Sequence, residues 1–277
     1  MIRKKYILGI DVGGTSIKYG LVSKQGKLIK FHEVPTPKTK SAILKTLSDI
    51  IELQQEQVSK IGLGLPGKLD LKQGKIIHTP NIKLSGVAIV KLLQKKFSLP
   101  TKIDNDANCF TLAEAIAGSG KIYNHVAGLT LGTGIGGGIV INKKIYRGSG
   151  HAGRLGHLII DCKNGKDLEG FLGAKKLKLK PLNYYKLEKD AKLKKPRAVN
   201  FFNHYGEVLG FGLINIIRTL DPEIIILGGK QSRSYSLFKP QMNKVINQYC
   251  SGRTKIVKSK LIDQAGIIGA AMLFTRN

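Results

Sequence analysis

The sequence predicts an α/β protein with two related lobes and a cleft between them. Strand-like apolar runs alternate along the chain with helical patterns, which is typical of α/β architectures. Two glycine-rich turns, Gly13–Gly14 and Gly132–Gly138, each lie between strand-like runs, and a third strand-like run follows each pair. The second half of the chain therefore repeats the plan of the first, with Asp11 corresponding to Gly132.

The first half begins with three strands, expected over 6–11, 16–23 and 27–33, that form an antiparallel meander broken by Pro35 and Pro37. Ser41 is expected to cap a helix that runs to about Glu56, with apolar residues at helical spacing. The further elements expected are a buried strand 61–65, a helix 87–97, a strand 101–103 and a helix 109–117.

The second half is expected to contain the hairpin around the second glycine turn, a helix over 200–220, a strand over 223–227 and the pair Gly228-Gly229. The apolar stretch 265–274 predicts a final helix.

Composition limits the function classes. The chain has 277 residues, and its three cysteines have no paired spacing, which fits a reducing cytoplasm. No apolar run is long enough for a signal peptide or a membrane span, so we expect a cytoplasmic protein without a membrane partner.

The net charge of +28 comes mainly from lysine, which supplies 38 of the 46 basic residues. The lysines are spread along the chain, and neither a helix-turn-helix extension nor zinc-finger spacing is present, so no specific nucleic-acid partner is expected. The densest basic segment, Lys175 to Arg197, is either a solvated helix and loop or a patch for a polyanion or membrane surface.

The two glycine turns predict nucleotide binding. Glycine lets backbone amides approach a charged ligand, and successive amides in such a turn form a concave anion site. Two other nucleotide motifs are excluded by context. The GxGxxG match at 132–137 runs into a strand rather than a helix, and the P-loop-like 118–122 has Ile122 where Ser or Thr should bind Mg²⁺. Two turns without a ligand would be the simpler reading of either motif alone.

Two aspartates are candidates for phosphoryl-transfer chemistry. Asp106 ends a strand and starts a helix, which suits a general base, although Asp104, Asn105 and Asp106 are also typical helix-capping residues. Asp11 could hold Mg²⁺ through water, or could simply bond the amides of its own turn. Asn81 and His157 lie in loop contexts suited to sugar contacts.

The chain resembles the ROK family, which contains repressors, open reading frames and sugar kinases. The resemblance covers nearly the whole chain and rests on motifs that occur in the family's order: DVGGTSIK (11–18), GLPG (64–67), TPN (79–81), NDAN (105–108), LGTGIGGG (131–138), GRLGH (153–157), DPEIIILGG (221–229) and AGIIGAA (265–271).

The resemblance implies the two-lobed actin-like ATPase (ribonuclease H-like) fold, with ATP and Mg²⁺ in the cleft. The N-terminal lobe, on the sugar and phosphate side, would be 1–106 plus 265–277, and the C-terminal lobe, on the nucleotide side, 107–264. Asp106 would be the base that takes the sugar hydroxyl proton. The residues expected at the nucleotide are Asp11, Gly13, Gly14, Thr15, Lys18, Gly132, Thr133, Gly134, Gly228 and Gly229. Those expected at the sugar are Gly67, Asn81, Asn105, Arg154, His157 and Glu169.

Two departures from the family pattern affect the sugar side. Family kinases usually carry a glutamate at the position of Arg154, and arginine has no acceptor for a sugar hydroxyl. Arg154 could bind an anionic substituent, pair with Glu169 or point into solvent. The family's zinc-binding cysteines are reduced to Cys162, so no structural zinc is expected.

The sequence therefore predicts a cytoplasmic, glucokinase-like enzyme that uses ATP to phosphorylate a small-molecule sugar, with glucose as the default acceptor. A kinase for an aminosugar or an acidic sugar, and a sensor of sugar or nucleotide without catalysis, remain as alternatives. The sequence leaves open the oligomeric state, including a homodimer, and which hydroxyl is phosphorylated.

Overall fold

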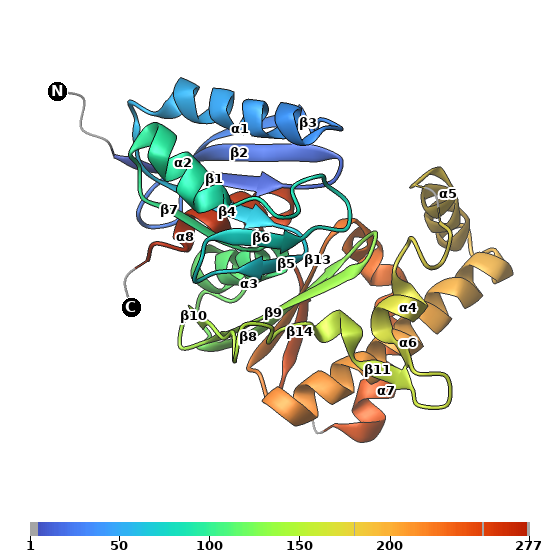
Figure 1. Cartoon of the computed structure of the whole chain (residues 1–277). Helices are drawn as coiled ribbons and strands as arrows, with labels where there is room; N and C mark the ends of the chain where they lie inside the picture. Colours follow the sequence, from blue (N-terminus) through green and yellow to red (C-terminus); the bar gives the residue numbers. More distant parts are fainter. Residues whose placement is uncertain (1–4, 180, 251, 276–277) are drawn as a thin grey trace.

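The computed structural model describes residues 5–179, 181–250 and 252–275, and two five-stranded sheets organise it (Figure 1). The sheets have the same plan: an antiparallel meander of three strands, followed by two strands parallel to the first of them. The duplication predicted from the sequence is thus present in the topology.

The first sheet has the strand order β3-β2-β1-β4-β7. Its strands are β1 (Tyr6–Val12), β2 (Ser16–Val22), β3 (Leu28–Pro35), β4 (Val58–Leu65) and β7 (Thr101–Asn105). Pro35 is the last residue of β3, opposite Ser16, so it ends the edge strand instead of interrupting the meander earlier.

The second sheet has the order β10-β9-β8-β13-β14. Its strands are β8 (His125–Leu131), β9 (Ile135–Ile141), β10 (Lys144–Ile145), β13 (Ile224–Gly228) and β14 (Lys255–Lys258). The last paired residues before the two glycine turns are Val12 and Leu131. Asp11 therefore corresponds to Thr130, and the equivalence with Gly132 predicted from the sequence is wrong, because the second turn is one residue shorter.

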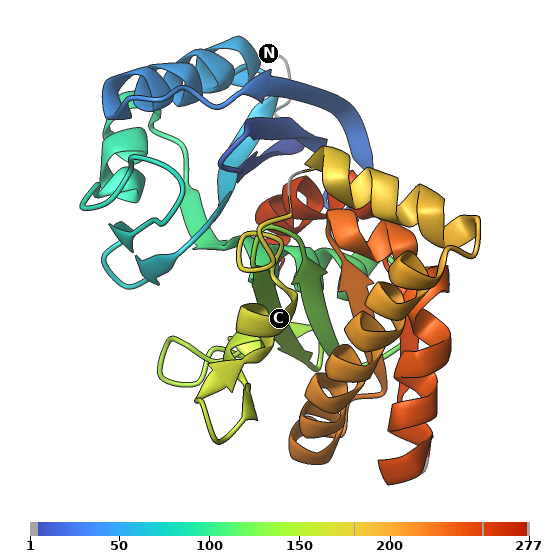
Figure 2. The same ribbon diagram turned by 90° about the vertical axis from the view of Figure 1, so that its right-hand side faces the viewer.

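Helices cover the outer faces of both sheets (Figure 2). Buried residues of α1 (Lys40–Gln54) and α2 (Ile89–Phe97) join one hydrophobic cluster with Leu8 and Ile10 of β1. The long helix α6 (Pro196–Leu220) and α7 (Tyr235–Tyr249) form a second cluster with Leu129 of β8.

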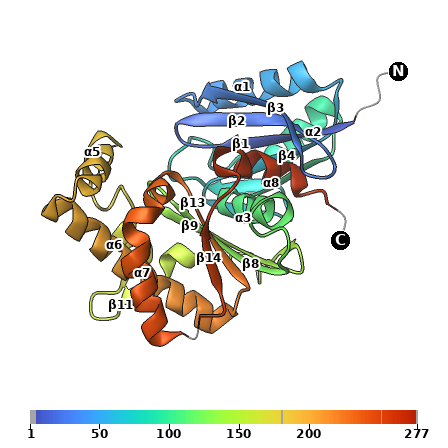
Figure 3. The ribbon, with the colours of Figure 1, turned by 180° about the vertical axis from the view of Figure 1, so that it is seen from behind.

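The inner faces meet through two crossing helices, α3 (Asp106–Ala117) and α8 (Ala265–Met272), which lie between the sheets (Figure 3). Their close approach requires glycine. A Cβ at Gly269 of α8 would overlap the carbonyl oxygen of Cys109 in α3, and one at Gly62 of β4 would overlap that of Ala270. Backbone packed on backbone fixes how α3, which begins with Asp106, sits between the two sheets.

The remaining elements are short or were not predicted. They are β5 (Lys68–Asp70), β6 (Lys75–His78), η1 (Leu155–His157), β11 (Ile159–Asp161), β12 (Lys166–Asp167), α4 (Leu168–Leu172), α5 (Pro181–Lys192), η2 (Lys230–Ser234) and η3 (Ile262–Gln264). The basic segment around α5 carries two exposed ion pairs, Lys192–Glu188 and Lys195–Asp190, as a solvated helix would.

Four predicted helix starts differ from the structure, and in two of them only the first residue is shifted: α2 begins at Ile89 rather than 87, and α6 at Pro196 rather than 200. Thr39 rather than Ser41 caps α1, because the Thr39 hydroxyl accepts from the amide of Ala42. Helix α3 begins at Asp106 instead of Cys109, with Asn105 as its cap. The division into lobes at 1–106 plus 265–277 and 107–264 remains our proposal. None of the helices in the described ranges is long and apolar enough to cross a membrane.

Candidate functional site

A cavity of about 700 Å³ lies where the two glycine turns face each other, and most of the predicted site residues line it. The predicted residues that line it are Gly13, Gly14, Gly67, Asn81, Asn105, Asp106, Gly132, Thr133, Gly134, Arg154, His157, Glu169 and Gly229. Asp11, Thr15, Lys18 and Gly228 are not among the lining residues.

The first turn joins β1 to β2 and is held by its own backbone. The amide of Gly13 donates to the carbonyl of Ser16 at 3.0 Å, and the hydroxyl of Thr36 donates to the carbonyl of Gly13 at 2.7 Å. A Cβ at Gly14 would lie 3.1 Å from that of Asn81, so this turn faces the Asn81 loop closely.

The second turn joins β8 to β9, and Glu169 of α4 supports it. The amide of Gly132 donates to the carbonyl of Gly134 at 3.0 Å, and Oε2 of Glu169 accepts from the amide of Ile135 at 2.7 Å. Glu169 therefore both lines the cavity and holds the turn, a structural role that the sequence did not predict.

Lys18 and Gly228 lie behind the cavity wall. Nζ of Lys18 is 3.0 Å from Oδ1 of Asp263, which also pairs with Arg233 at 3.1 Å. This cluster joins β2 of the first sheet to η2 beside the second. A Cβ at Gly228 would collide with the ring of Phe110, so this glycine allows α3 to pack on β13.

Asp106 is the first residue of α3, and its carboxylate lines the cavity. Oδ1 accepts from the amide of Ala107 at 2.9 Å, and the Asn105 side chain accepts from the same amide at 3.0 Å. Burial raises the pKa of Asp106 to about 6, although hydrogen bonds from Ala107 and Asn105 act in the opposite direction. A carboxylate with such a pKa is a good proton acceptor near neutral pH.

Asp11, near the end of β1, forms an acidic pair with Asp106. Burial and the negative charge of Asp106 raise the pKa of Asp11 to about 7, and the charge of Lys18 only partly offsets them. A Cβ at Gly266 would overlap the Asp11 carboxylate, so the carboxylate lies against the first turn of α8.

From the sequence, Asp104 was expected only to cap a helix. In the structure it anchors the segment that leads to Asp106. Its buried carboxylate accepts from Nε and Nη2 of Arg147, at 2.9 and 2.6 Å. It also accepts from the Asn105 amide at 2.7 Å and the Asn108 side chain at 2.8 Å. Nothing in the local sequence pairs Asp104 with Arg147, which is 43 residues away.

Asn108 is the last residue of the NDAN motif, and the sequence predicted no role for it. Because its amide nitrogen donates to Asp104, its Oδ1 is fixed as the other atom of the amide, which does not contact Asp104. That oxygen is buried, lacks a hydrogen-bond partner and belongs to a residue that lines the cavity. Buried polar atoms are nearly always paired, so Asn108 fits an acceptor for a ligand hydroxyl.

At the other end of the cavity, Arg154, His157 and Asp167 form a chain of hydrogen bonds. Nδ1 of His157 is 2.8 Å from Oδ2 of Asp167, and its Nε2 is 3.1 Å from Nη2 of Arg154. Burial acts to raise the pKa of Asp167, but hydrogen bonds from His157 and Gly170 lower it. The Asp167 carboxylate accepts a hydrogen bond and the Arg154 guanidinium donates one. The proton of a neutral His157 is therefore assigned to Nδ1, and Nε2 accepts from Arg154.

This geometry settles one of the open alternatives for Arg154. Arg154 contacts His157, whereas Glu169 is bonded to Ile135, so the ion pair between Arg154 and Glu169 is not formed. Both ring nitrogens of His157 are engaged, and within the described ranges no group of three or more side chains could hold a metal.

Comparisons with known proteins place this arrangement in context. The model of the ROK family matches residues 7–277. The chain belongs to the ROK family. It is 32% identical to an N-acetyl-D-glucosamine kinase of Vibrio atlanticus (strain LGP32), over 96% of this chain and 98% of that one.

Solved structures agree. The chain resembles a ROK hexokinase from Thermus thermophilus (TM-score 0.83, 27% identity, 96% and 97% of the two chains). It also resembles a ROK family glucokinase from Streptomyces griseus in complex with glucose and AMPPNP (TM-score 0.81, 26% identity, 97% and 98%). The actin-like ATPase fold implied by the sequence motifs is thereby confirmed.

Proposed function

We propose that this ROK-family protein transfers the γ-phosphoryl group of ATP to a hexose hydroxyl, with Asp106 as the general base. The observation that carries the proposal is the position of Asp106, in one cavity with both glycine turns and with a pKa of about 6. Phosphoryl transfer needs an oriented hydroxyl, a base beside it and groups that hold the phosphates.

The nucleotide side supports ATP with Mg²⁺. The amides of Gly13–Gly14 and Gly132–Gly134 suit a polyphosphate held from both sides. Burial, and after it the nearby negative charge of Asp106, raises the pKa of Asp11, so a cation would be favoured beside this pair. Mg²⁺ is usually held by one or two carboxylates with phosphates and water, and Asp11, which does not line the cavity, would hold it through water. When bound, the ion would neutralise charge on the phosphates.

On the sugar side, hydrogen-bonding groups gather around Asp106. Asn105, Asn81, His157 and Glu169 line the same cavity as the base. The unpartnered Oδ1 of Asn108 adds an acceptor that a sugar hydroxyl would satisfy. We assign these residues to holding the sugar so that one hydroxyl lies against Asp106.

Glucose is the default acceptor, in agreement with the Streptomyces glucokinase that binds it. A second candidate is an N-acetylated aminosugar, which one observation favours. Arg154 lines the cavity and offers only donors, and a carbonyl oxygen on the sugar would accept from it. The Vibrio relative is a kinase for such a sugar.

ADP release coupled to a reporter enzyme, measured across glucose, N-acetylglucosamine, N-acetylmannosamine and glucuronate, tests the acceptor. If Arg154 selects the substrate, Arg154→Glu raises kcat/KM for glucose and lowers it for glucuronate and for the two N-acetylated sugars. A parallel change in kcat/KM for every sugar would mean that Arg154 does not select the substrate, and glucose would remain the favoured acceptor.

A further inference from the structure

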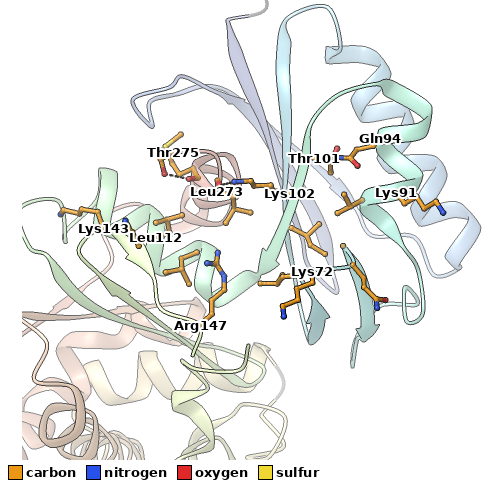
Figure 4. Close-up of a pocket in the computed structure, with 18 residues that line it drawn as sticks. Lys72, Lys91, Gln94, Thr101, Lys102, Leu112, Lys143, Arg147, Leu273 and Thr275 are labelled. Atoms are coloured by element: carbon orange, nitrogen blue, oxygen red, sulfur yellow. Dashed lines mark hydrogen bonds between the residues drawn. The ribbon is translucent and has the colours of Figure 1, made fainter. Parts of the chain in front are cut away.

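The structure contains a second cavity of about 700 Å³, separate from the one that holds Asp106 (Figure 4). Its walls come from both lobes. The N-terminal lobe supplies the β5–β6 turn, α2 and β7, and the C-terminal lobe supplies Leu112 from the middle of α3, β10 and Arg147. The C-terminal end of α8 closes it with Leu273.

The charge of this second cavity is one-sided. Six cationic side chains line it, and no aspartate or glutamate does: Lys72, Lys91, Lys102, Lys143, Lys144 and Arg147. The catalytic cavity has the same volume but is lined by Lys68 and Arg154 together with Asp104, Asp106 and Glu169. The second cavity is thus far more positive than the proposed ATP site, and a cleft lined by one sign of charge concentrates ions of the other sign.

Protein partners account for only some of these cations. Nζ of Lys143 donates to the carbonyls of Ala115 and Tyr123, among others, and Nζ of Lys102 donates to that of Leu273 at 3.0 Å. Arg147 pairs with Asp104. Among the described residues, no carboxylate oxygen lies within 4.0 Å of Nζ of Lys72, Lys91 or Lys144, which is the distance that defines an ion pair.

The arrangement of the cations defines the ligand. Of the lining cations, Lys72 and Lys91 belong to the N-terminal lobe, whereas Lys144 and Arg147 belong to the C-terminal lobe. We propose that this cavity is a second ligand site, which binds one compact anion carrying two or more phosphate groups between the lobes. A single phosphate would reach one wall only, so it should bind more weakly than a ligand that spans both.

The site also has a structural link to the base. Arg147 is partly exposed in this cavity, and its guanidinium holds Asp104, whose carboxylate also accepts from the Asn105 amide. Asn105 caps the helix that begins with Asp106. An anion at Arg147 therefore lies two side chains from the loop of the proposed base.

Calorimetric titration of the full chain with tripolyphosphate tests the proposal. A hexose bisphosphate and inorganic phosphate serve as further probes that distinguish an inorganic from a sugar-borne source. The cavity variant is Lys72→Gln with Lys144→Gln. The control is Lys186→Gln with Lys244→Gln, which removes the same charge from exposed positions on α5 and α7.

We expect one bound molecule per chain for tripolyphosphate or the bisphosphate, with inorganic phosphate at least tenfold weaker. The cavity variant should bind at least tenfold more weakly than the original chain, and the control within twofold of it. Equal weakening in both variants would mean diffuse attraction, and an unchanged cavity variant would mean binding elsewhere, including the catalytic cavity. Either result overturns the proposal. A single-stranded 20-nucleotide nucleic acid is also titrated, and tighter binding of this strand than of every other probe, dependent on Lys72 and Lys144, would likewise overturn it.

Discussion

Asp11→Asn should stabilise the protein at alkaline pH while it removes the proposed ligand of Mg²⁺. The pKa of Asp11 is raised from 3.8 to about 7, so the folded chain favours the neutral acid. Ionisation of Asp11 therefore costs stability, and the loss grows as pH rises from about 4 through 7. One pKa unit corresponds to about 1.4 kcal/mol, which gives an upper value of about 4 kcal/mol for the shift. Because Asp11 is only half-buried, we expect about 2 to 4 kcal/mol.

The assay is thermal unfolding of both proteins at pH 4.5 and pH 8, without nucleotide or Mg²⁺. For a chain of this size the gain corresponds to a rise in Tm of about 4–8 °C at pH 8, and it should fall to about a quarter of that at pH 4.5. Asp49→Asn, at an exposed acid on α1, is the matched control and should leave Tm almost unchanged at both values. An equal gain at both pH values, or a loss at pH 8, would refute the reasoning.

Three further predictions follow from the same site and fold. Asp106→Asn should lower kcat by ~10²–10⁴ with little change in sugar affinity, and a variant that keeps more than about a third of its turnover would contradict this. In the original chain, kcat/KM should rise with pH through about 6, because the base must be ionised. Elemental analysis should find no stoichiometric zinc, and about one zinc per chain would overturn that prediction. Gly62→Ala should cost more than about 3 kcal/mol in chemical denaturation, because its Cβ would overlap the carbonyl of Ala270, whereas a cost below about 1 kcal/mol would show that α8 can move away.

The sequence predicted the strands and the glycine turns well because their signals are local. Alternating apolar residues and glycine pairs fix β1, β2, β8 and β9 without knowledge of their neighbours. Helix starts were less accurate, since Thr39 and Ser41 are both good caps and only the fold decides between them.

The parts of the site that the sequence missed depend on contacts between distant residues. Asp104 is held by Arg147, and the role of Asn108 is visible only because one of its atoms is left without a partner. Gly228 stays a predicted nucleotide residue, and its contact with Phe110 adds a packing role that the motif does not reveal. Such pairings are set by tertiary structure and have no local pattern.

We propose that Asp106 takes the proton from a sugar hydroxyl while ATP donates its γ-phosphoryl group. Phosphorus NMR of the purified chain with ATP, Mg²⁺ and either glucose or N-acetylglucosamine follows this transfer itself. We expect a new sugar-phosphate resonance that grows in step with ADP, and its near absence with Asp106→Asn. Release of inorganic phosphate without a sugar phosphate, or equal sugar-phosphate formation by the variant, would contradict it.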